Sequence, residues 1–211
     1  MMAPGRSGVL PATRPSRLVP DMAQTIETIV TYLEMRSNPH RHVPPPANLK
    51  LLLMRAEAPP VHFYRYLYDT VGDGLMWIDR KKMSDAELAA SISDELIEVY
   101  VLYVSGVPAG YFEVDARGKP TEVELKYFGL IRDFQGRGLG KYLLAEAITA
   151  CWAHAPERVI VDTCTFDGPI ALPLYQKMGF APYDRRPKLY TLPEGTTVDM
   201  FLDPRYTAHT S

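Results

Sequence analysis

Cysteine, net charge and long apolar runs are all scarce in this sequence. Its 211 residues include only two cysteines, Cys151 and Cys164, too few for a disulfide framework and without the spacing of metal ligands. No apolar run reaches the roughly 18 residues that a membrane-spanning helix needs. The 23 basic residues nearly balance the 25 acidic ones, so no strong field draws the chain to nucleic acid or to a membrane. We therefore expect a cytoplasmic protein with neither partner.

Patterns typical of metal sites are also missing. The five histidines form no pair of the H-E-x-x-H kind. His40 and His42 lie close together in a proline-rich stretch, but no third ligand lies nearby in the sequence. We expect a flexible loop at this point and no metal site.

The length of the chain suits one domain rather than two. Residues 1–22 contain four prolines and three arginines, with no acid before Asp21, which predicts a disordered extension. Met22 is a candidate for the natural start. Residues 23–211 are then expected to form a single domain with its core at about 49–202, and the prolines of 38–48 predict a surface loop.

Stretches rich in β-branched and aromatic residues alternate with stretches of helical periodicity. Strands are expected at 25–33 (at an edge), 49–54 (the first central strand), 98–104, 107–114, 123–131, 158–163, around Tyr190 and at 198–202. Helices are expected at 60–71, from Ser84 with its capping-box glutamate at 87, at 139–154, and at 169–178 before Gly179. Pairs of strands followed by a strand–helix–strand unit predict an α/β (α+β) fold with a mixed central sheet.

The most informative segment is Asp133–Lys141, with the sequence DFQGRGLGK. Glycines at 136, 138 and 140 stand between an expected strand and an expected helix, so the backbone can approach a ligand closely. Several free N–H groups then point outward at the positive end of the helix dipole, and Arg137 and Lys141 add full charges. This arrangement indicates an anion site rather than a simple turn, for which one glycine would suffice.

Two common phosphate-binding motifs do not fit this segment. The G-x-x-x-x-G-K-[ST] loop requires glycine where Gln135 stands, and a hydroxyl residue where Tyr142 follows the lysine. The dinucleotide fingerprint G-x-G-x-x-G fails by one residue in its glycine spacing, although Asp162 lies near the expected position of a ribose-binding acid. A nucleotide-dependent oxidoreductase is therefore disfavoured.

Gln135–Gly140 matches [Q/R]-x-x-G-x-[G/A], and Ala171–Phe180 (ALPLYQKMGF) matches A-x-x-L-Y-x-x-x-G-F, about 30 residues further on. Through these two motifs the chain resembles the GNAT superfamily of acetyltransferases, strongly over residues 123–181 and more weakly over 49–202. The resemblance implies a mostly antiparallel sheet with one splayed parallel pair, flanked by helices. It also implies acetyl-CoA as the acyl-donor cosubstrate, without a metal.

The resemblance assigns cofactor contacts residue by residue. The loop around the pyrophosphate of coenzyme A would consist of Gln135, Gly136, Arg137, Gly138, Leu139, Gly140 and Lys141. Backbone groups of Phe128 and Leu130 would bind the pantetheine arm, and the Leu130 N–H would polarise the thioester carbonyl, like a one-donor oxyanion hole. Gly168 stands where many members have an asparagine that contacts the cofactor. Thr165 or Asp167 could replace that contact, or cap the following helix.

Two residues are candidates for catalysis. Tyr175 corresponds to the family tyrosine that protonates the departing thiolate, with the alternative that it is a packed aromatic residue of an amphipathic helix. Glu124 lies 13 residues before Arg137, the spacing of the basic glutamate in the histone-acetylating branch of the superfamily. Glu122 shares its strand face. The alternatives are that both glutamates face solvent, or that Lys126 pairs with Glu124.

The acceptor pocket of the family involves the first two helices and the last strands, where this chain is rich in aromatic residues. Candidate acceptor contacts are Tyr64, Trp77, Glu122 and Tyr190, although aromatic residues at helical spacing are often part of a core. We expect N-acetyl transfer to a primary amine of a small molecule or protein, by direct attack in a ternary complex, since no histidine lies near Cys164 to activate it as an acyl carrier. The alternative is a non-catalytic acetyl-CoA sensor, and a homodimer is compatible with either function.

Overall fold

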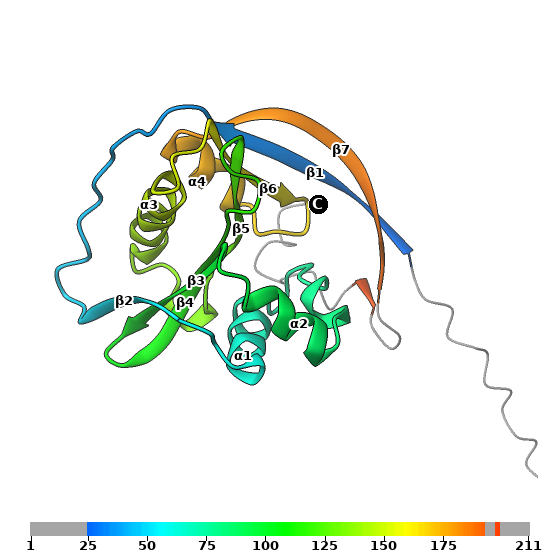
Figure 1. Cartoon of the computed structure of the whole chain (residues 1–211), viewed down its shortest axis with the longest axis horizontal. Coiled ribbons are helices and arrows are strands. Elements are labelled where there is room, and N and C mark those ends of the chain that lie inside the picture. The colour runs from blue at the N-terminus through cyan, green and yellow to red at the C-terminus, as the bar shows by residue number, and fades with distance from the viewer. Residues whose placement is uncertain (1–24, 193–196, 199–211) are drawn as a thin grey trace, which may run out of the picture.

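The computed structural model describes residues 25–192 and 197–198, which form one seven-stranded sheet flanked by four α-helices (Figure 1). The strands are β1 (Thr25–Met35), β2 (Leu51–Arg55), β3 (Ile97–Val104), β4 (Val107–Asp115), β5 (Glu122–Leu130), β6 (Arg158–Cys164) and β7 (Ala181–Thr191). The α-helices are α1 (Val61–Val71), α2 (Asp85–Ile92), α3 (Leu139–Trp152) and α4 (Ala171–Met178), with 3₁₀ turns η1 (Arg80–Lys82) and η2 (Arg132–Phe134). The extension predicted at 1–22 and most of the strand predicted at 198–202 lie outside the described residues.

The strand order is β2-β3-β4-β5-β6-β1-β7, and among these neighbours only β5 and β6 are parallel. The prediction of a mixed, mostly antiparallel sheet with one parallel pair is therefore confirmed. No helix in the described part of the chain is long and apolar enough to cross a membrane.

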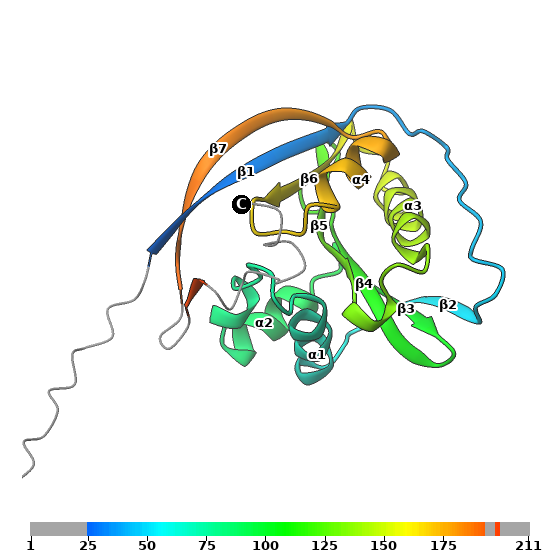
Figure 2. The same cartoon turned by 180° about the vertical axis from the view of Figure 1, so that it is seen from behind.

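Two strand positions differ from the sequence prediction. β1, expected at an edge, lies between β6 and β7, and β2, expected to be central, is the edge strand beside β3. The reason is the long connection from β1 to β2, which runs around the outside of α3 to the opposite edge of the sheet (Figures 1 and 2). β7 is also longer than predicted, and pairs with β1 along most of its length. The two strands form an arched ribbon that continues past the end of β6 (Figure 2).

Alternating side chains of the central strands supply two cores on opposite faces of the sheet. On β4, Phe112 and Val114 belong to the core under α3 and α4, whereas Tyr111 belongs to the core under α1 and α2. This alternation follows from the period of two in a β-strand. Helix α2 begins with the predicted capping box, in which Ser84 Oγ accepts from the Glu87 N–H and the Glu87 carboxylate accepts from the Ser84 N–H.

A β-bulge interrupts the pairing of β5 with β4. Glu113 pairs with Tyr127 and Val114 pairs with Leu125, so Lys126 is the extra residue on β5. On its other side β5 pairs with β6 only from Glu122 to Glu124. Beyond this point the two parallel strands separate, as the resemblance implied.

A buried ion pair fixes the segment between α1 and α2 to the sheet. Arg80 Nη2 lies 2.5 Å from Glu113 Oε1, and Tyr64 Oη donates a hydrogen bond to Glu113 Oε2. Arg80 Nη1 also donates to Ser91 Oγ of α2 at 2.7 Å. Glu113 is fully buried, so its charge needs these partners. The network therefore ties η1, α1 and α2 to β4.

We predict that Arg80→Met destabilises the fold by about 3–5 kcal/mol, because it leaves the Glu113 carboxylate buried without its cation. Equilibrium unfolding in urea would measure the change. The matched control is Lys81→Met, which removes a neighbouring cation in a solvent-exposed pair with Asp69 and should cost less than about 1 kcal/mol. Equal effects of the two substitutions would contradict a structural role for the buried pair.

Candidate functional site

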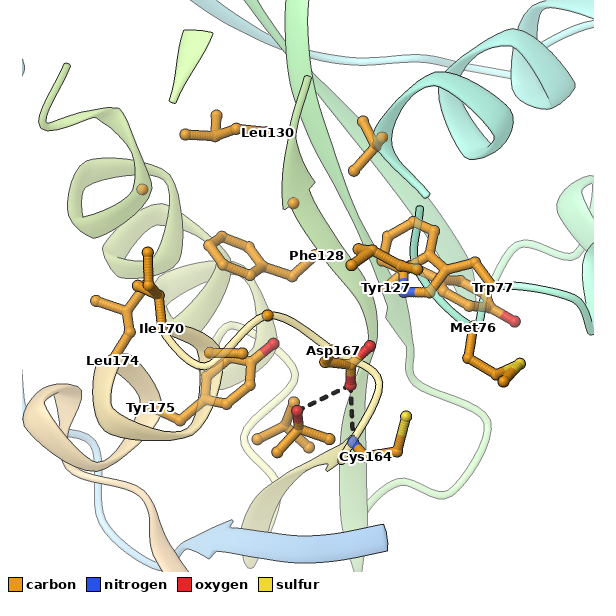
Figure 3. Close-up of a pocket in the computed structure, with 18 of the residues that line it drawn as sticks. Met76, Trp77, Tyr127, Phe128, Leu130, Cys164, Asp167, Ile170, Leu174 and Tyr175 are labelled. Carbon is orange, nitrogen blue, oxygen red and sulfur yellow. Dashed lines mark hydrogen bonds between the residues drawn. The ribbon is translucent and has the colours of Figure 1, made fainter. Parts of the chain in front are cut away.

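A cavity of about 460 Å³ opens where β5 and β6 separate (Figure 3). This size is within the range of small-molecule sites. One end is lined by the glycine loop and the N-terminal part of α3, and the other by the segment after α1, the end of β6 and β7. The cavity therefore passes through the gap in the sheet and has two differently built ends.

The glycine loop forms the first end. Gly136 and Gly138 have φ values of +73° and +77°, which L side chains rarely adopt. Gly138 is the N-cap of α3, and no side chain caps the helix there. The first N–H groups of this 14-residue helix are thus left for a ligand, and the helix dipole favours an anion. Gly136, Gly138, Gly140 and Lys141 line the cavity.

The other three residues of the predicted loop are Gln135, which lines the cavity, and Arg137 and Leu139, which do not. Gln135 lines the cavity and donates from Nε2 to the Leu130 carbonyl oxygen at 3.1 Å, which fixes the loop to the end of β5. Arg137 lies with its guanidinium 5.2 Å from the centre of the Phe134 ring and is not part of the cavity wall. Leu139 is fully buried in the core, so its side chain supports the helix rather than a ligand.

The free edge of β5 forms the middle of the cavity. Ile131 donates its N–H to the Ala109 carbonyl, which makes this pair a hydrogen-bonded one. In an antiparallel ladder, hydrogen-bonded pairs alternate with non-hydrogen-bonded pairs. Phe128 and Leu130 belong to the non-hydrogen-bonded pairs, so they direct their N–H groups away from β4. That direction is the side on which β6 has separated from β5. Both residues line the cavity, so their outward N–H groups are available to an extended ligand.

Tyr175 enters the same cavity from α4 (Figure 3). Its ring lies near Phe128 and Phe180, with ring centres 6.1 and 5.9 Å apart. Burial, followed by the negative charges of Asp167 and Asp162, raises the pKa of the Tyr175 hydroxyl well above its usual value. This hydroxyl is therefore protonated throughout the neutral range and can act as a proton donor.

Asp167 and Thr165 follow β6, where the sequence left two roles open for them. Asp167 Oδ2 accepts from Thr163 Oγ1 and from the Cys164 N–H, both at 2.8 Å, and the residue lines the cavity (Figure 3). Thr165 lies outside the cavity wall, and its hydroxyl forms a 2.7 Å hydrogen bond with Thr28 Oγ1 of β1. Neither residue is the N-cap of α4, which is Ile170. Asp167 is thus the better placed of the two for a ligand.

The predicted base, Glu124, lies beside the cavity rather than in its wall. Its Oε1 is 2.9 Å from Lys126 Nζ, so the ion pair that the sequence left open is formed. Burial raises the pKa of Glu124, and the charge of Lys126 opposes this effect. Glu122 shares the strand face but pairs with Arg158 at 2.7 Å, and Arg158 also contacts Glu34. Glu122 therefore has a structural partner and does not line the cavity.

The acceptor residues predicted from aromatic content divide into two groups. Trp77 and Tyr190 line the second end of the cavity. Tyr64 does not, because its side chain is fully buried and its hydroxyl is bound to Glu113. The prediction that Tyr64 contacts the acceptor is therefore corrected, and the physical reason is that its helical position faces the sheet.

Four charged residues of the second end were not singled out as acceptor contacts: Asp79, Lys126, Asp162 and Lys188. Asp79 follows Trp77 in a segment without regular periodicity, and Lys188 belongs to a strand that was only partly predicted. Asp162 was considered only as a ribose-binding acid. Its place at the carboxyl end of a predicted parallel strand was a usable signal, because ligands of α/β sheets bind at such ends.

Cys164 also lines the cavity, but burial raises the pKa of its thiol to about 11. The thiol is therefore protonated at neutral pH and a poor nucleophile. Among the described residues, no group of three or more His, Cys, Asp or Glu side chains is arranged to bind a metal ion.

A model of the acetyltransferase (GNAT) family matches residues 60–180, more than half of the chain. The protein therefore belongs to the GNAT acetyltransferase family. No curated protein matches the sequence. Family membership supports an acyltransferase that uses acetyl-CoA. The matched residues include the whole glycine loop and helix α4, which carries Tyr175.

Solved structures share the fold at low sequence identity. A tandem GNAT protein from the clavulanic acid biosynthesis pathway is 20% identical with a TM-score of 0.55, over 78% of this chain and 53% of that chain. A protein of Novosphingobium aromaticivorans described as a GNAT-family acetyltransferase is 14% identical with a TM-score of 0.55, over 85% and 72% of the two chains. The aminoglycoside N-acetyltransferase AAC(6')-Iy, solved with CoA, is 15% identical with a TM-score of 0.50, over 72% and 99%.

The chain spans about half to two thirds of some structures that it resembles. It covers 53% of the tandem GNAT protein and 62% of a functionally unknown conserved protein from Staphylococcus epidermidis, to which it is 14% identical with a TM-score of 0.51. At these identities the likeness concerns the fold alone.

We predict that Gly138→Ala raises the dissociation constant of coenzyme A at least about tenfold, since a Cβ at the start of α3 keeps the diphosphate from the N–H groups. The left-handed φ of this residue should also cost about 1–2 kcal/mol of stability. Calorimetric titration and thermal unfolding would measure the two effects.

The matched control is Gly106→Ala, in the β3–β4 turn, where φ is +87° and nothing lies within 4 Å of the added Cβ. It should show the same loss of stability with unchanged affinity for coenzyme A. If both variants bind coenzyme A like the unmodified protein, the glycine loop is not the diphosphate site.

Proposed function

We propose that this protein is an N-acetyltransferase that transfers the acetyl group of acetyl-CoA to a primary amine of a small molecule or protein. The observation that carries the proposal is the continuity of the cavity through the gap between β5 and β6. One continuous cavity is therefore lined by the N-terminus of α3, by Phe128 and Leu130 with their outward N–H groups, and by the buried Tyr175. A donor and an acceptor can then enter from opposite ends and meet in a ternary complex.

The residues at the first end fit coenzyme A. The N–H groups at Gly136 and Gly138 and the ammonium group of Lys141 would hold the diphosphate, while Gln135 fixes the loop to β5. Phe128 and Leu130 would bind the extended pantetheine arm through their backbone groups, as a further strand would bind. Acetyl-CoA supplies the thioester that the amine attacks.

Two groups of the chain would stabilise the transfer. The Leu130 N–H donates to the thioester carbonyl oxygen as negative charge develops there. Tyr175 gives its proton to the departing thiolate, and its raised pKa keeps that proton available at neutral pH. Direct attack requires no covalent enzyme intermediate, in agreement with the protonated thiol of Cys164. Glu124 as the base that deprotonates the amine stays a prediction.

The proposal is tested by thiol release from acetyl-CoA across a panel of small amines and peptide N-termini, together with calorimetric binding of acetyl-CoA. Binding with amine-dependent release supports the transferase. Binding without release on any acceptor would favour the alternative, a sensor that binds acetyl-CoA without catalysis. Absence of binding would contradict both functions.

We predict that Tyr175→Phe lowers kcat about 10²-fold, because the thiolate then leaves without a general acid. The dissociation constant of acetyl-CoA should be unchanged, since the ring packing against Phe128 and Phe180 is retained. Tyr142→Phe is the matched control: Tyr142 lies on α3, outside the cavity wall, and its variant should keep full activity. Equal kcat values for both variants would remove Tyr175 from the mechanism.

A further inference from the structure

Asp162 lies on β6 just beyond the point where β6 separates from β5. Glu124 of β5 pairs with Ile160 of β6, and this is the last pair before the strands diverge. Asp162 lies two residues further along β6, so it points to the same face as Ile160. It is therefore the first side chain on that face beyond the point of separation. It also lines the cavity, whereas Glu124 does not.

The partners of the two carboxylates differ as well. Glu124 is neutralised by Lys126 at 2.9 Å. Within the described part of the chain, the carboxylate of Asp162 has no hydrogen bond or ion pair, although it is only partly exposed. A half-buried carboxylate facing a cavity without a partner is a suitable site for a cationic ligand group.

The charged groups around Asp162 come from four different segments. Lys126 belongs to β5, Asp79 to the segment after α1, Asp167 to the loop after β6, and Lys188 to β7. Burial raises the pKa of the Asp162 carboxyl, and Lys126 and Lys188 lower it, while Asp167 and Asp79 raise it. Because Glu124 offsets the charge of Lys126, the surroundings as a whole favour a cation.

The uncharged wall of this end is aromatic and apolar. Trp77 and Met76 come from the segment that the Arg80–Glu113 pair fixes to the sheet, and Tyr190 comes from β7. The Trp77 ring is held by Tyr68 and Tyr127, whose ring centres lie 5.3 and 5.2 Å away. This rigid aromatic surface suits a flat apolar body beside the cationic group.

We propose that Asp162 binds the ammonium group of an aromatic primary amine and takes one of its protons, while Glu124 acts on Asp162 from outside the cavity, mainly by offsetting the charge of Lys126. This rests on the proposed function and names the acceptor class and the proton acceptor of the same site. Glu124 is then a positioning residue, and Asp162 touches the reacting nitrogen.

The proton and electron balance is complete without a further reactant. Asp162 takes one proton from the ammonium and later releases it to solvent. The neutral nitrogen uses its lone pair to form the C–N bond, and the C–S bond electrons leave on sulfur. The nitrogen loses its second proton as the amide forms, which restores the Tyr175 proton that the thiolate received. One amide, one thiol and one solvent proton result.

Binding is tested first, with 2-phenylethylamine as the probe and the full chain saturated with coenzyme A. Calorimetric titration at pH 7 should show binding to the unmodified protein and to Glu124→Gln, and at least a tenfold weaker binding to Asp162→Asn. Unchanged affinity for coenzyme A in each variant is the control for folding. No binding to the unmodified protein would overturn the acceptor class, and equal binding to Asp162→Asn would overturn the role of Asp162.

The pH dependence of kcat/KM for the same amine separates the two carboxylates. If Asp162 is the base, the profile of the unmodified enzyme rises at low pH as this carboxyl ionises and then levels. Asp162→Asn must take the rare neutral amine from solution, so its rate should rise tenfold per pH unit without levelling below the pKa of the amine, about 10.4 for a lysine-like amine. At pH 7 the loss is expected to be about 10²–10³-fold.

Two further variants keep the test decisive if Asp162→Asn fails to fold. Glu124→Gln leaves the charge of Lys126 unopposed and should move the rise at low pH to lower pH without abolishing it. Lys126→Met removes the cation and should move the same rise in kcat/KM to higher pH. If the rise of kcat/KM at low pH disappears in Glu124→Gln, Glu124 is the base and the proposal is overturned. A rise at low pH that neither variant shifts would also overturn it. Normal acetyl-CoA binding and thiol release in that case would leave the proposed function intact.

Discussion

The separation of two parallel strands is the constraint on which the site depends. The extra residue at Lys126 offsets β5 against β4, and the pairing of β5 with β6 ends after Glu124. From that point the free edge of β5 directs backbone N–H groups into space rather than into a ladder. The sheet thus gives up several hydrogen bonds, and a ligand with an extended, amide-containing arm can restore them. The cavity exists because the sheet is incomplete at its centre.

Sequence reasoning succeeded where the determinants are local. The glycines at 136 and 138 stand at left-handed positions in the loop before α3, and the motif around Tyr175 lies within one helix and its glycine cap. Most strands and helices were also found, because each has its own periodicity. Strand order was less accessible. β1 is not at an edge because β7, from the far end of the described chain, pairs with it, and β2 is at an edge because a surface connection around α3 carries the chain there.

The second end of the cavity was harder to predict because it is assembled from distant segments. Trp77 precedes a short 3₁₀ turn, Asp162 lies on β6, and Lys188 and Tyr190 lie on β7. A single-residue bulge decides which strand residues meet there. Tyr64 illustrates the opposite error: its aromatic character is used in the core, where its hydroxyl satisfies a buried carboxylate. Residue type alone cannot separate these two uses of tyrosine.

The arched ribbon of β1 and β7 joins segments from the two extremes of the described chain. It contributes Val30, Lys188 and Tyr190 to the cavity wall, while the glycine loop comes from the middle of the chain. In the proposed function, the ribbon would thus shape the acceptor end of the cavity without belonging to the glycine loop. Replacement of the ribbon could give the same acyl donor a new acceptor, which makes these two strands the natural place to begin redesigning selectivity.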